Sequence, residues 1–213
     1  MAHEAALHAH HFDSLEQQHE AATLGTWIFL VTEVMFFGGM FLMYAAYRAA
    51  YPAAFVAASH KLDLVLGGIN TAVLLTSSLT MALAVNAAAT SRDRGKIIKF
   101  LVVTALLGVL FLGFKGIEYH HKWEQGLVPG WHYTYDGPQA RHAQLMFSLY
   151  FAMTGFHALH IIIGLGIMAV MAVFAWQGRF TPEHHMGIEV TGLYWHFVDI
   201  IWVFLYPLLY LIR

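Results

Sequence analysis

Long runs of apolar residues dominate this chain, and short polar segments separate them. Five runs reach the length of about 20 residues that a helix needs to cross the hydrocarbon core of a bilayer. They are Leu24–Tyr47, Leu62–Asn86, Ile97–Ile117, Gln144–Trp176 and Ile188–Ile212. Apolar residues are continuous along each run rather than alternating, which favours helices over the strands of a membrane barrel. The pattern predicts an all-α fold, an integral membrane bundle of five transmembrane helices.

The composition supports a membrane protein and narrows the chemistry. Hydrophobic residues make up 59% of the chain and charged residues 11%, whereas soluble domains carry about 25% charged residues. The net charge of -2 and the lack of a basic stripe predict that no nucleic acid is bound. The chain has no cysteine, which excludes disulfides, thiolate metal ligands and thiolate catalysis.

The polar segments predict the domain organisation and the topology. We expect a His-rich tail over residues 1–23 and a single transmembrane domain over residues 24–213. The tail either binds a metal or is a flexible, protonatable segment, and its irregular spacing favours the second. The loop Arg92–Lys96 is the densest basic cluster and is predicted to be cytoplasmic. With five spans, the N-terminus is then also cytoplasmic and Arg213 lies outside.

One carboxylate, Glu33, lies inside the first apolar run. Insertion of an ionisable residue at the centre of a membrane helix costs about 2.5–3.5 kcal/mol on translocon scales, so such a residue needs a protein or water partner. Two interpretations remain open for Glu33. It belongs to a functional site, or it donates a hydrogen bond between helices in its protonated form.

Several other polar side chains lie within or beside the later apolar runs, and we expect them to form an interhelical polar network. The fourth run carries two histidines three residues apart, and the fifth carries a histidine and an aspartate with the same spacing. Carboxylates at the end of the third run and the start of the fifth complete the set. The members are Glu118, His157, His160, Glu189, His196 and Asp199.

These side chains allow two kinds of site. Histidines and carboxylates are ligands of non-haem metals, and neutral imidazoles also bridge helices through both ring nitrogens. Glu-x-x-His does not occur on two separate helices, as a di-iron bundle site requires. The sequence therefore favours a structural network without a metal. Lys115, near the end of the third run, is expected to extend its ammonium group toward the membrane surface.

Three segments resemble those of one known family. Trp27–Phe37 (WIFLVTEVMFF), Thr154–Gly164 (TGFHALHIIIG) and Tyr194–Trp202 (YWHFVDIIW) are similar to three helices of subunit III of haem–copper terminal oxidases. Weaker matches at Asn70–Leu75 and Ile117–Tyr119 follow in the expected order. The chain resembles the bacterial five-helix short form of cytochrome c oxidase subunit III.

The resemblance implies a non-redox accessory subunit without catalytic residues or a metal of its own. It implies direct packing on subunit I, with subunit II in the same complex and the haems and copper in these partner subunits. It also implies bound phospholipid, and helices in two groups with a lipid-filled cleft between them. In the family, the glutamate that Glu33 matches lies near the contact with subunit I. The implied role is to stabilise subunit I and support proton uptake during aerobic electron transport in a bacterial cytoplasmic (inner) membrane.

The chain departs from the family at one position. Long-form relatives carry an arginine that holds a lipid head group, and the ungapped match to it is Phe174. Arg179, five residues later, is a substitute candidate for lipid binding.

Close relatives serve quinol oxidases and nitric oxide reductase clusters, and both remain alternatives. Glu33 and Tyr194–Trp202 match the cytochrome c oxidase branch best. A remote alternative is a free-standing membrane metalloenzyme that uses His157, His160 and His196.

Overall fold

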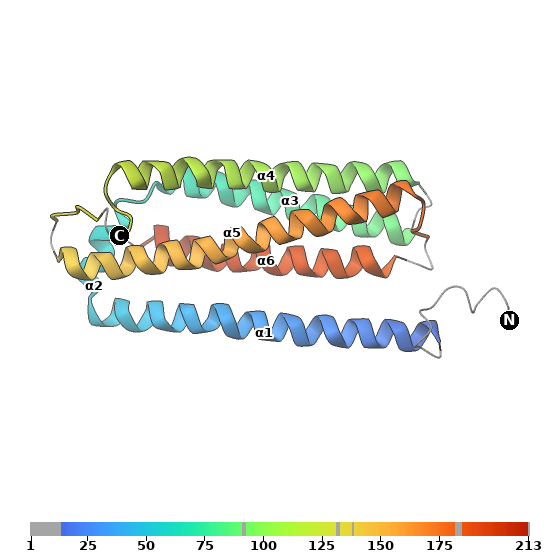
Figure 1. Cartoon of the computed structure of the whole chain (residues 1–213), viewed down its shortest axis with the longest axis horizontal. Helices are drawn as coiled ribbons and strands as arrows, with labels where there is room; N and C mark the ends of the chain where they lie inside the picture. The colour runs from blue at the N-terminus through green and yellow to red at the C-terminus, as the bar shows by residue number, and fades with distance from the viewer. Residues whose placement is uncertain (1–13, 91–92, 131–132, 138, 182–184, 213) are drawn as a thin grey trace. The chain divides into compact units, whose positions relative to one another are not determined.

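A computed structural model describes residues 14–90, 93–130, 133–137, 139–181 and 185–212. These residues form six α-helices, which Figure 1 labels. In chain order the helices are α1 (Leu15–Ala50), α2 (Pro52–Ser59), α3 (Leu64–Thr90), α4 (Arg94–Glu124), α5 (Ala140–Trp176) and α6 (Met186–Tyr210). Five of the six, all except α2, are long and apolar enough to cross a membrane. The prediction of an all-helical membrane protein is confirmed.

Four of the five long helices, α1, α3, α4 and α5, are longer than the apolar runs that predict them, whereas α6 has the same length as its run and begins two residues earlier. Helix α4 begins where Asp93 accepts hydrogen bonds from the backbone amides of Gly95 and Lys96, which is the usual role of an N-cap aspartate. Helix α5 ends at Trp176, and two residues later Gly178, with a φ of 72°, reverses the chain direction. Residues beyond the apolar runs continue these four helices, so hydropathy alone does not locate the helix ends.

Helix α2 was not predicted. Its eight residues follow Tyr51, and Pro52 at its first position fits a helix start because proline has no amide hydrogen to leave unpaired there. Part of the predicted N-terminal tail is also helical, since α1 begins at Leu15. The tail histidines His3, His8, His10 and His11, and also Arg92 and Arg213, lie outside the described residues.

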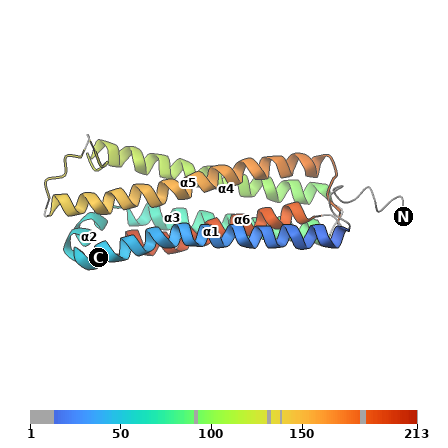
Figure 2. The ribbon, with the colours of Figure 1, turned by 60° about the horizontal axis from the view of Figure 1, so that its bottom comes forward.

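The chain divides into two compact units, with the boundary between Phe36 and Phe37. The first unit contains the part of α1 up to Phe36, which includes Glu33. The second unit contains the rest of α1 and helices α2–α6. Within it, α3 packs on α4 and α6, and α5 packs on α4, α6 and α2. Figures 1 and 2 show α3–α6 running side by side.

Trp195 of α6 packs against three other helices of the second unit, α3, α4 and α5. Its side chain is fully buried, and its indole nitrogen donates to the Ser77 hydroxyl of α3 at 3.0 Å. A Cβ at Gly108 of α4 or at Gly164 of α5 would lie only 2.9 Å from the indole ring. The two glycines therefore make room for the ring, in line with the role of small residues at membrane helix interfaces.

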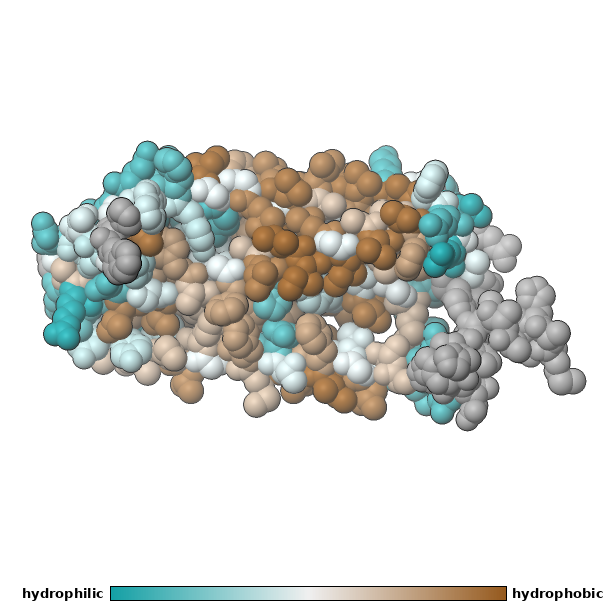
Figure 3. Space-filling model, in the orientation of Figure 1, coloured by the Kyte–Doolittle hydropathy of each residue, from teal (hydrophilic) through white to brown (hydrophobic). Residues whose placement is uncertain are grey.

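The surface matches the membrane assignment. On the face in Figure 3, hydrophobic residues predominate along the middle of the helices, with a small hydrophilic patch among them, and most hydrophilic residues gather toward both ends. Large apolar side chains such as Leu106 and Val109 of α4 and Ile162 of α5 point outward. Such a surface is stable against lipid tails but not against water.

Candidate functional site: a buried ion pair among three helices

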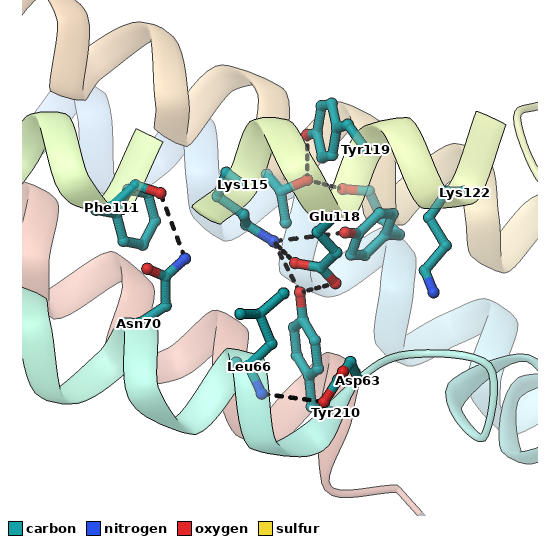
Figure 4. A network of polar contacts seen from close by, with 12 residues as sticks. Asp63, Leu66, Asn70, Phe111, Lys115, Glu118, Tyr119, Lys122 and Tyr210 are labelled. Carbon is teal, nitrogen blue, oxygen red and sulfur yellow. Dashed lines mark hydrogen bonds and ion pairs between the residues drawn. The ribbon is translucent and has the colours of Figure 1, made fainter. Parts of the chain in front are cut away.

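A buried ion pair lies at the meeting point of α4, α5 and α6 (Figure 4). The Nζ atom of Lys115 is 2.9 Å from Oε2 of Glu118, one turn later on α4. The side chains of both residues are almost fully buried, with exposed fractions of 4% and 2%. A charge in such a place is strongly destabilising unless it is paired and hydrogen-bonded.

Two tyrosines complete the hydrogen bonding of the pair. The Tyr210 hydroxyl of α6 accepts a hydrogen bond from Lys115 at 2.7 Å and donates one to Oε1 of Glu118 at 2.7 Å. The Tyr150 hydroxyl of α5 accepts from Lys115 at 3.4 Å. All three ammonium hydrogens and both carboxylate oxygens therefore have partners, and these partners connect three helices.

Aromatic rings surround the ammonium group. Its nitrogen lies 4.7 Å from the centroid of the Trp202 ring and 5.1 Å from that of Tyr150. Both distances are within the range of cation–π attraction, which is stronger when the cation is removed from water. Next to the pair, the Tyr119 hydroxyl of α4 contacts that of Thr154 on α5 at 2.5 Å. We call Lys115, Glu118, Tyr119, Tyr150, Thr154, Trp202 and Tyr210 the Lys115 cluster.

The expectation that Lys115 reaches the membrane surface is wrong. Helix α4 continues to Glu124, so about 14 Å of helix follows Lys115 at the usual rise of 1.5 Å per residue. The side chain points into the bundle, where Glu118 neutralises it. The signal in the sequence was the spacing of Lys115 and Glu118, because residues three apart on a helix are neighbours on its surface.

The end of α4 is fastened to the α2–α3 turn by a second buried lysine. Lys122 has an exposed fraction of 4% and donates a short hydrogen bond to the Lys61 carbonyl oxygen. In the same turn, Asp63 accepts from the amides of Val65 and Leu66 at 3.0 Å and so caps α3.

Among the predicted network residues, His157 of α5 is completely buried between aromatic rings. Its ring centroid lies 5.4 Å from that of Phe111 on α4 and 5.1 Å from that of Trp202 on α6. Neither ring nitrogen has a hydrogen-bond partner within the described part of the chain. His157 thus contacts the Lys115 cluster through Trp202.

The other members of the set have different partners. Nδ1 of His160 contacts the Phe156 carbonyl oxygen of its own helix at 2.7 Å. His196 was expected to join the α5 histidines, but its Nδ1 lies 2.7 Å from the Ser78 hydroxyl of α3. The reason is packing, because α6 lies against α3 as well as α5.

Asp199, one turn after His196, is buried with an exposed fraction of 3%. Neither of its carboxyl oxygens has a partner with hydrogen-bond geometry among the described residues. The Ser78 hydroxyl is nevertheless close enough to interact with the carboxyl group of Asp199. The carboxylate of Glu189 is 3.0 Å from Nε2 of His185, one turn earlier. The predicted set therefore divides into separate contacts, of which only Glu118 lies in the Lys115 cluster.

The remaining candidates lie apart from the cluster. Arg179 is exposed, and its guanidinium lies 4.5 Å from the ring centroid of Phe174. Glu33 lies half-way along α1, in the first unit. Among the residues that the structure describes, no three His, Asp or Glu side chains come together in a way that could hold a metal ion.

Comparison with known proteins agrees with the motifs of the first, fourth and fifth long helices. The family described as Cytochrome c oxidase subunit III matches residues 1–125 and 132–212. The chain belongs to this family. A cytochrome c oxidase subunit 3 of Synechocystis sp. is 34% identical over 88% of this chain and 74% of its own length. The subunit 3 of Oncorhynchus mykiss is 33% identical over 97% of this chain and 74% of its own length.

Membership of the subunit III family confirms the resemblance found in the three motifs. It also confirms the predicted function as subunit III of a haem–copper oxidase. The Lys115 cluster lies in the matched region, yet sequence reasoning assigned its lysine to the membrane surface.

Proposed function

We propose that this chain is the non-redox subunit III of a respiratory cytochrome c oxidase, in its five-helix form, and that it stabilises subunit I during turnover. The family match across almost the whole described chain is the observation that carries the proposal. Relatives named cytochrome c oxidase subunit 3 favour cytochrome c over quinol as the electron donor of the complex. In the proposal, the haems and copper belong to partner subunits, and subunit I is the direct contact.

In our proposal, these side chains have a structural role rather than a catalytic one. Lys115, Glu118, Tyr150 and Tyr210 hold three helices through hydrogen bonds that are all satisfied. A satisfied buried polar network makes a bundle rigid. In our proposal, this rigidity gives subunit I a fixed surface to pack on, and phospholipids fill the remaining contacts.

The proposed topology places the loop Arg92–Lys96 and the N-terminus in the cytoplasm and the C-terminus outside a bacterial cytoplasmic membrane. The basic loop supports this orientation because cytoplasmic loops are enriched in Lys and Arg. Reporter fusions after residue 94 and at the C-terminus should report opposite sides. Activity of both fusions on one side would contradict the five-span topology.

Glu33 is proposed to lie at the contact with subunit I and to support proton uptake. Replacement by glutamine keeps the size and the polarity of the side chain but removes the exchangeable carboxyl proton. In the purified oxidase, Glu33→Gln should leave assembly and the initial rate near normal and shorten the number of turnovers before inactivation. The measurement is oxygen consumption followed until the activity is lost.

Glu20→Gln is the matched control, since Glu20 is an exposed carboxylate earlier on the same helix. An oxidase with Glu33→Gln that lasts as long as the wild type would remove the proton-related role. It would leave the assignment to subunit III in place.

A further inference from the structure

Asp199 places a carboxyl group deep inside the second unit, near the middle of the membrane. Its exposed fraction is 3%, and it lies outside the Lys115 cluster. Helix α6 has 25 residues and is about 38 Å long at 1.5 Å per residue, whereas the hydrocarbon core is about 30 Å thick. On the same scale Asp199 is about 20 Å from the first residue of the helix, so hydrocarbon extends on both sides of it.

Among the described residues, the helices that pack on α6 offer Asp199 no counter-charge. Helix α3 contains no lysine, arginine, histidine or carboxylate between Leu64 and Thr90. In the apolar stretch of α5, His157 is enclosed by aromatic rings, and Nδ1 of His160 contacts the Phe156 carbonyl oxygen of its own helix. Neither oxygen of Asp199 has a hydrogen-bond partner within the described part of the chain.

Other charged side chains along α6 have contacts elsewhere. Glu189, near the start of the helix, pairs with His185. Lys115 and Glu118 of α4 neutralise each other beside Tyr210, the last residue of α6. On the part of α1 in the second unit, Arg48 lines a cavity together with Leu208, which is about 14 Å beyond Asp199 along α6. Hydrogen bonds to other acceptors are donated by the hydroxyls of Tyr44, Tyr194, Tyr206 and Tyr210.

Ser78 of α3 links Asp199 to a second titratable side chain. Its hydroxyl oxygen lies 2.7 Å from Nδ1 of His196 and is close enough to the Asp199 carboxyl group to interact with it. His196 and Asp199 are three residues apart on α6, which makes them neighbours on its surface. Ser78 and His196 are half-buried, so the group of three extends from the buried carboxyl toward the surface of the unit.

The hydrogen bonds of these three groups can be arranged in two ways. A serine hydroxyl has one hydrogen to donate and lone pairs to accept with, and a neutral imidazole has one donor and one acceptor nitrogen. If Asp199 is ionised, Ser78 donates to it and accepts from His196, and a carboxylate with a single donor remains in hydrocarbon. If Asp199 carries a proton, it donates to Ser78, and Ser78 donates to Nδ1 of His196. The second arrangement leaves no charge in the membrane.

We propose that Asp199 is a proton-binding site, protonated at rest, and that Ser78 and His196 connect it to the surface of the unit. We call Asp199, Ser78 and His196 the Ser78 relay. An isolated carboxylate in an apolar medium costs so much free energy that the group takes up a proton instead. The relay holds the His196 proton on Nε2, the ring nitrogen opposite the serine. This role goes beyond the stabilisation of subunit I and does not rest on the proposed role of Glu33.

The relay releases a proton in one concerted shift. A water molecule at His196 accepts the Nε2 proton, the Ser78 proton passes to Nδ1, and the Asp199 proton passes to the Ser78 hydroxyl oxygen. One proton leaves the unit, Asp199 becomes a carboxylate, and His196 remains neutral with its proton on Nδ1. The reverse shift protonates Asp199 again, so the site stores one proton at mid-membrane depth.

The test of the proton site is infrared spectroscopy of the purified oxidase. A protonated carboxyl group has a C=O stretching band that a carboxylate lacks, and the band moves to lower frequency when deuterium replaces the proton. Asp199→Asn should remove one such band and still assemble, because asparagine keeps the shape and the donor of the neutral acid. Glu189→Gln is the matched control, since Glu189 is on the same helix and pairs with His185. It should leave the band in place.

The test of the relay is the rate at which the Asp199 band moves after transfer into D2O. His196→Leu should slow this exchange about 100-fold, since a positioned side chain that transfers a proton speeds such reactions about 10²–10⁴-fold. His120→Leu, at an exposed histidine of α4, should leave the rate unchanged. Ser78→Ala removes the middle group and should slow the exchange as well, which keeps the test valid if the histidine variant does not assemble.

Three results would overturn the inference. An acid band that persists in Asp199→Asn would show that Asp199 is ionised. Failure of Asp199→Asn to assemble would show that a neutral donor does not satisfy the site. An unchanged exchange rate in His196→Leu or Ser78→Ala would show that the proton does not leave through the relay.

Discussion

Replacement of Glu118 by leucine is expected to cost about 3–5 kcal/mol of stability, because it leaves the buried Lys115 charge without its partner. The carboxylate accepts from Lys115 at 2.9 Å and from Tyr210 at 2.7 Å, and the exposed fractions of 4% and 2% leave no route for water to replace it. A buried charge in a membrane protein that loses its partner has no water nearby to replace that partner. The measurement is the midpoint of thermal unfolding of the purified complex.

The double variant Lys115→Met with Glu118→Leu should regain most of the loss. Removing both charges leaves an apolar pair of similar volume, and such replacements are often neutral or stabilising. Glu124→Leu is the control on the same helix, since Glu124 is exposed and its ion pair with the exposed His120 has a distance of 3.6 Å. Exposed pairs contribute about 0–1 kcal/mol. A double variant as unstable as Glu118→Leu would show that the ion pair is not what the single variant disturbs.

Gly164→Ala is expected to destabilise the bundle by about 1–3 kcal/mol, the usual effect of an extra methyl group in a closely packed core. The added Cβ would lie 2.9 Å from the ring of Trp195, and the ring cannot withdraw because its nitrogen is bonded to Ser77 at 3.0 Å. The indole would have to shift and lose either this hydrogen bond or its contact with Gly108.

Gly166→Ala, two residues away, is the matched control and should act in the opposite direction. A Cβ there meets nothing within 4 Å, and alanine is about 1 kcal/mol better than glycine inside a helix. Thermal midpoints should therefore fall for Gly164→Ala and stay equal or rise for Gly166→Ala. An equal fall of the thermal midpoint in both variants would mean that helix flexibility, and not the packing of Trp195, matters at these positions.

The helical architecture could be predicted because it follows from the solvent. In hydrocarbon every backbone polar group needs a partner, so an apolar run of sufficient length becomes a helix. The runs do not set the helix ends, because caps such as Asp93 and Gly178 act beyond the hydrophobic region. Helix α2 is too short to give a periodic signal.

The candidate site was only half predictable. The spacing of Lys115 and Glu118 indicates that their side chains are neighbours. That the pair is buried depends on how far α4 continues and on tyrosines of α5 and α6 that are distant in sequence. His196 was expected in one network with the α5 histidines, but spacing along a helix says which residues share a face, not which helix that face meets. Here it meets Ser78 of α3.

The central claim, that this chain is a subunit of a haem–copper oxidase, is tested most directly by purification of the tagged chain from its native membrane. The account predicts that oxidase subunit I is retained in equal amount, with the absorption spectrum of its haems and with cytochrome c oxidase activity. A chain that purifies alone in mild detergent, with no haem spectrum and no oxidase subunit, would contradict it.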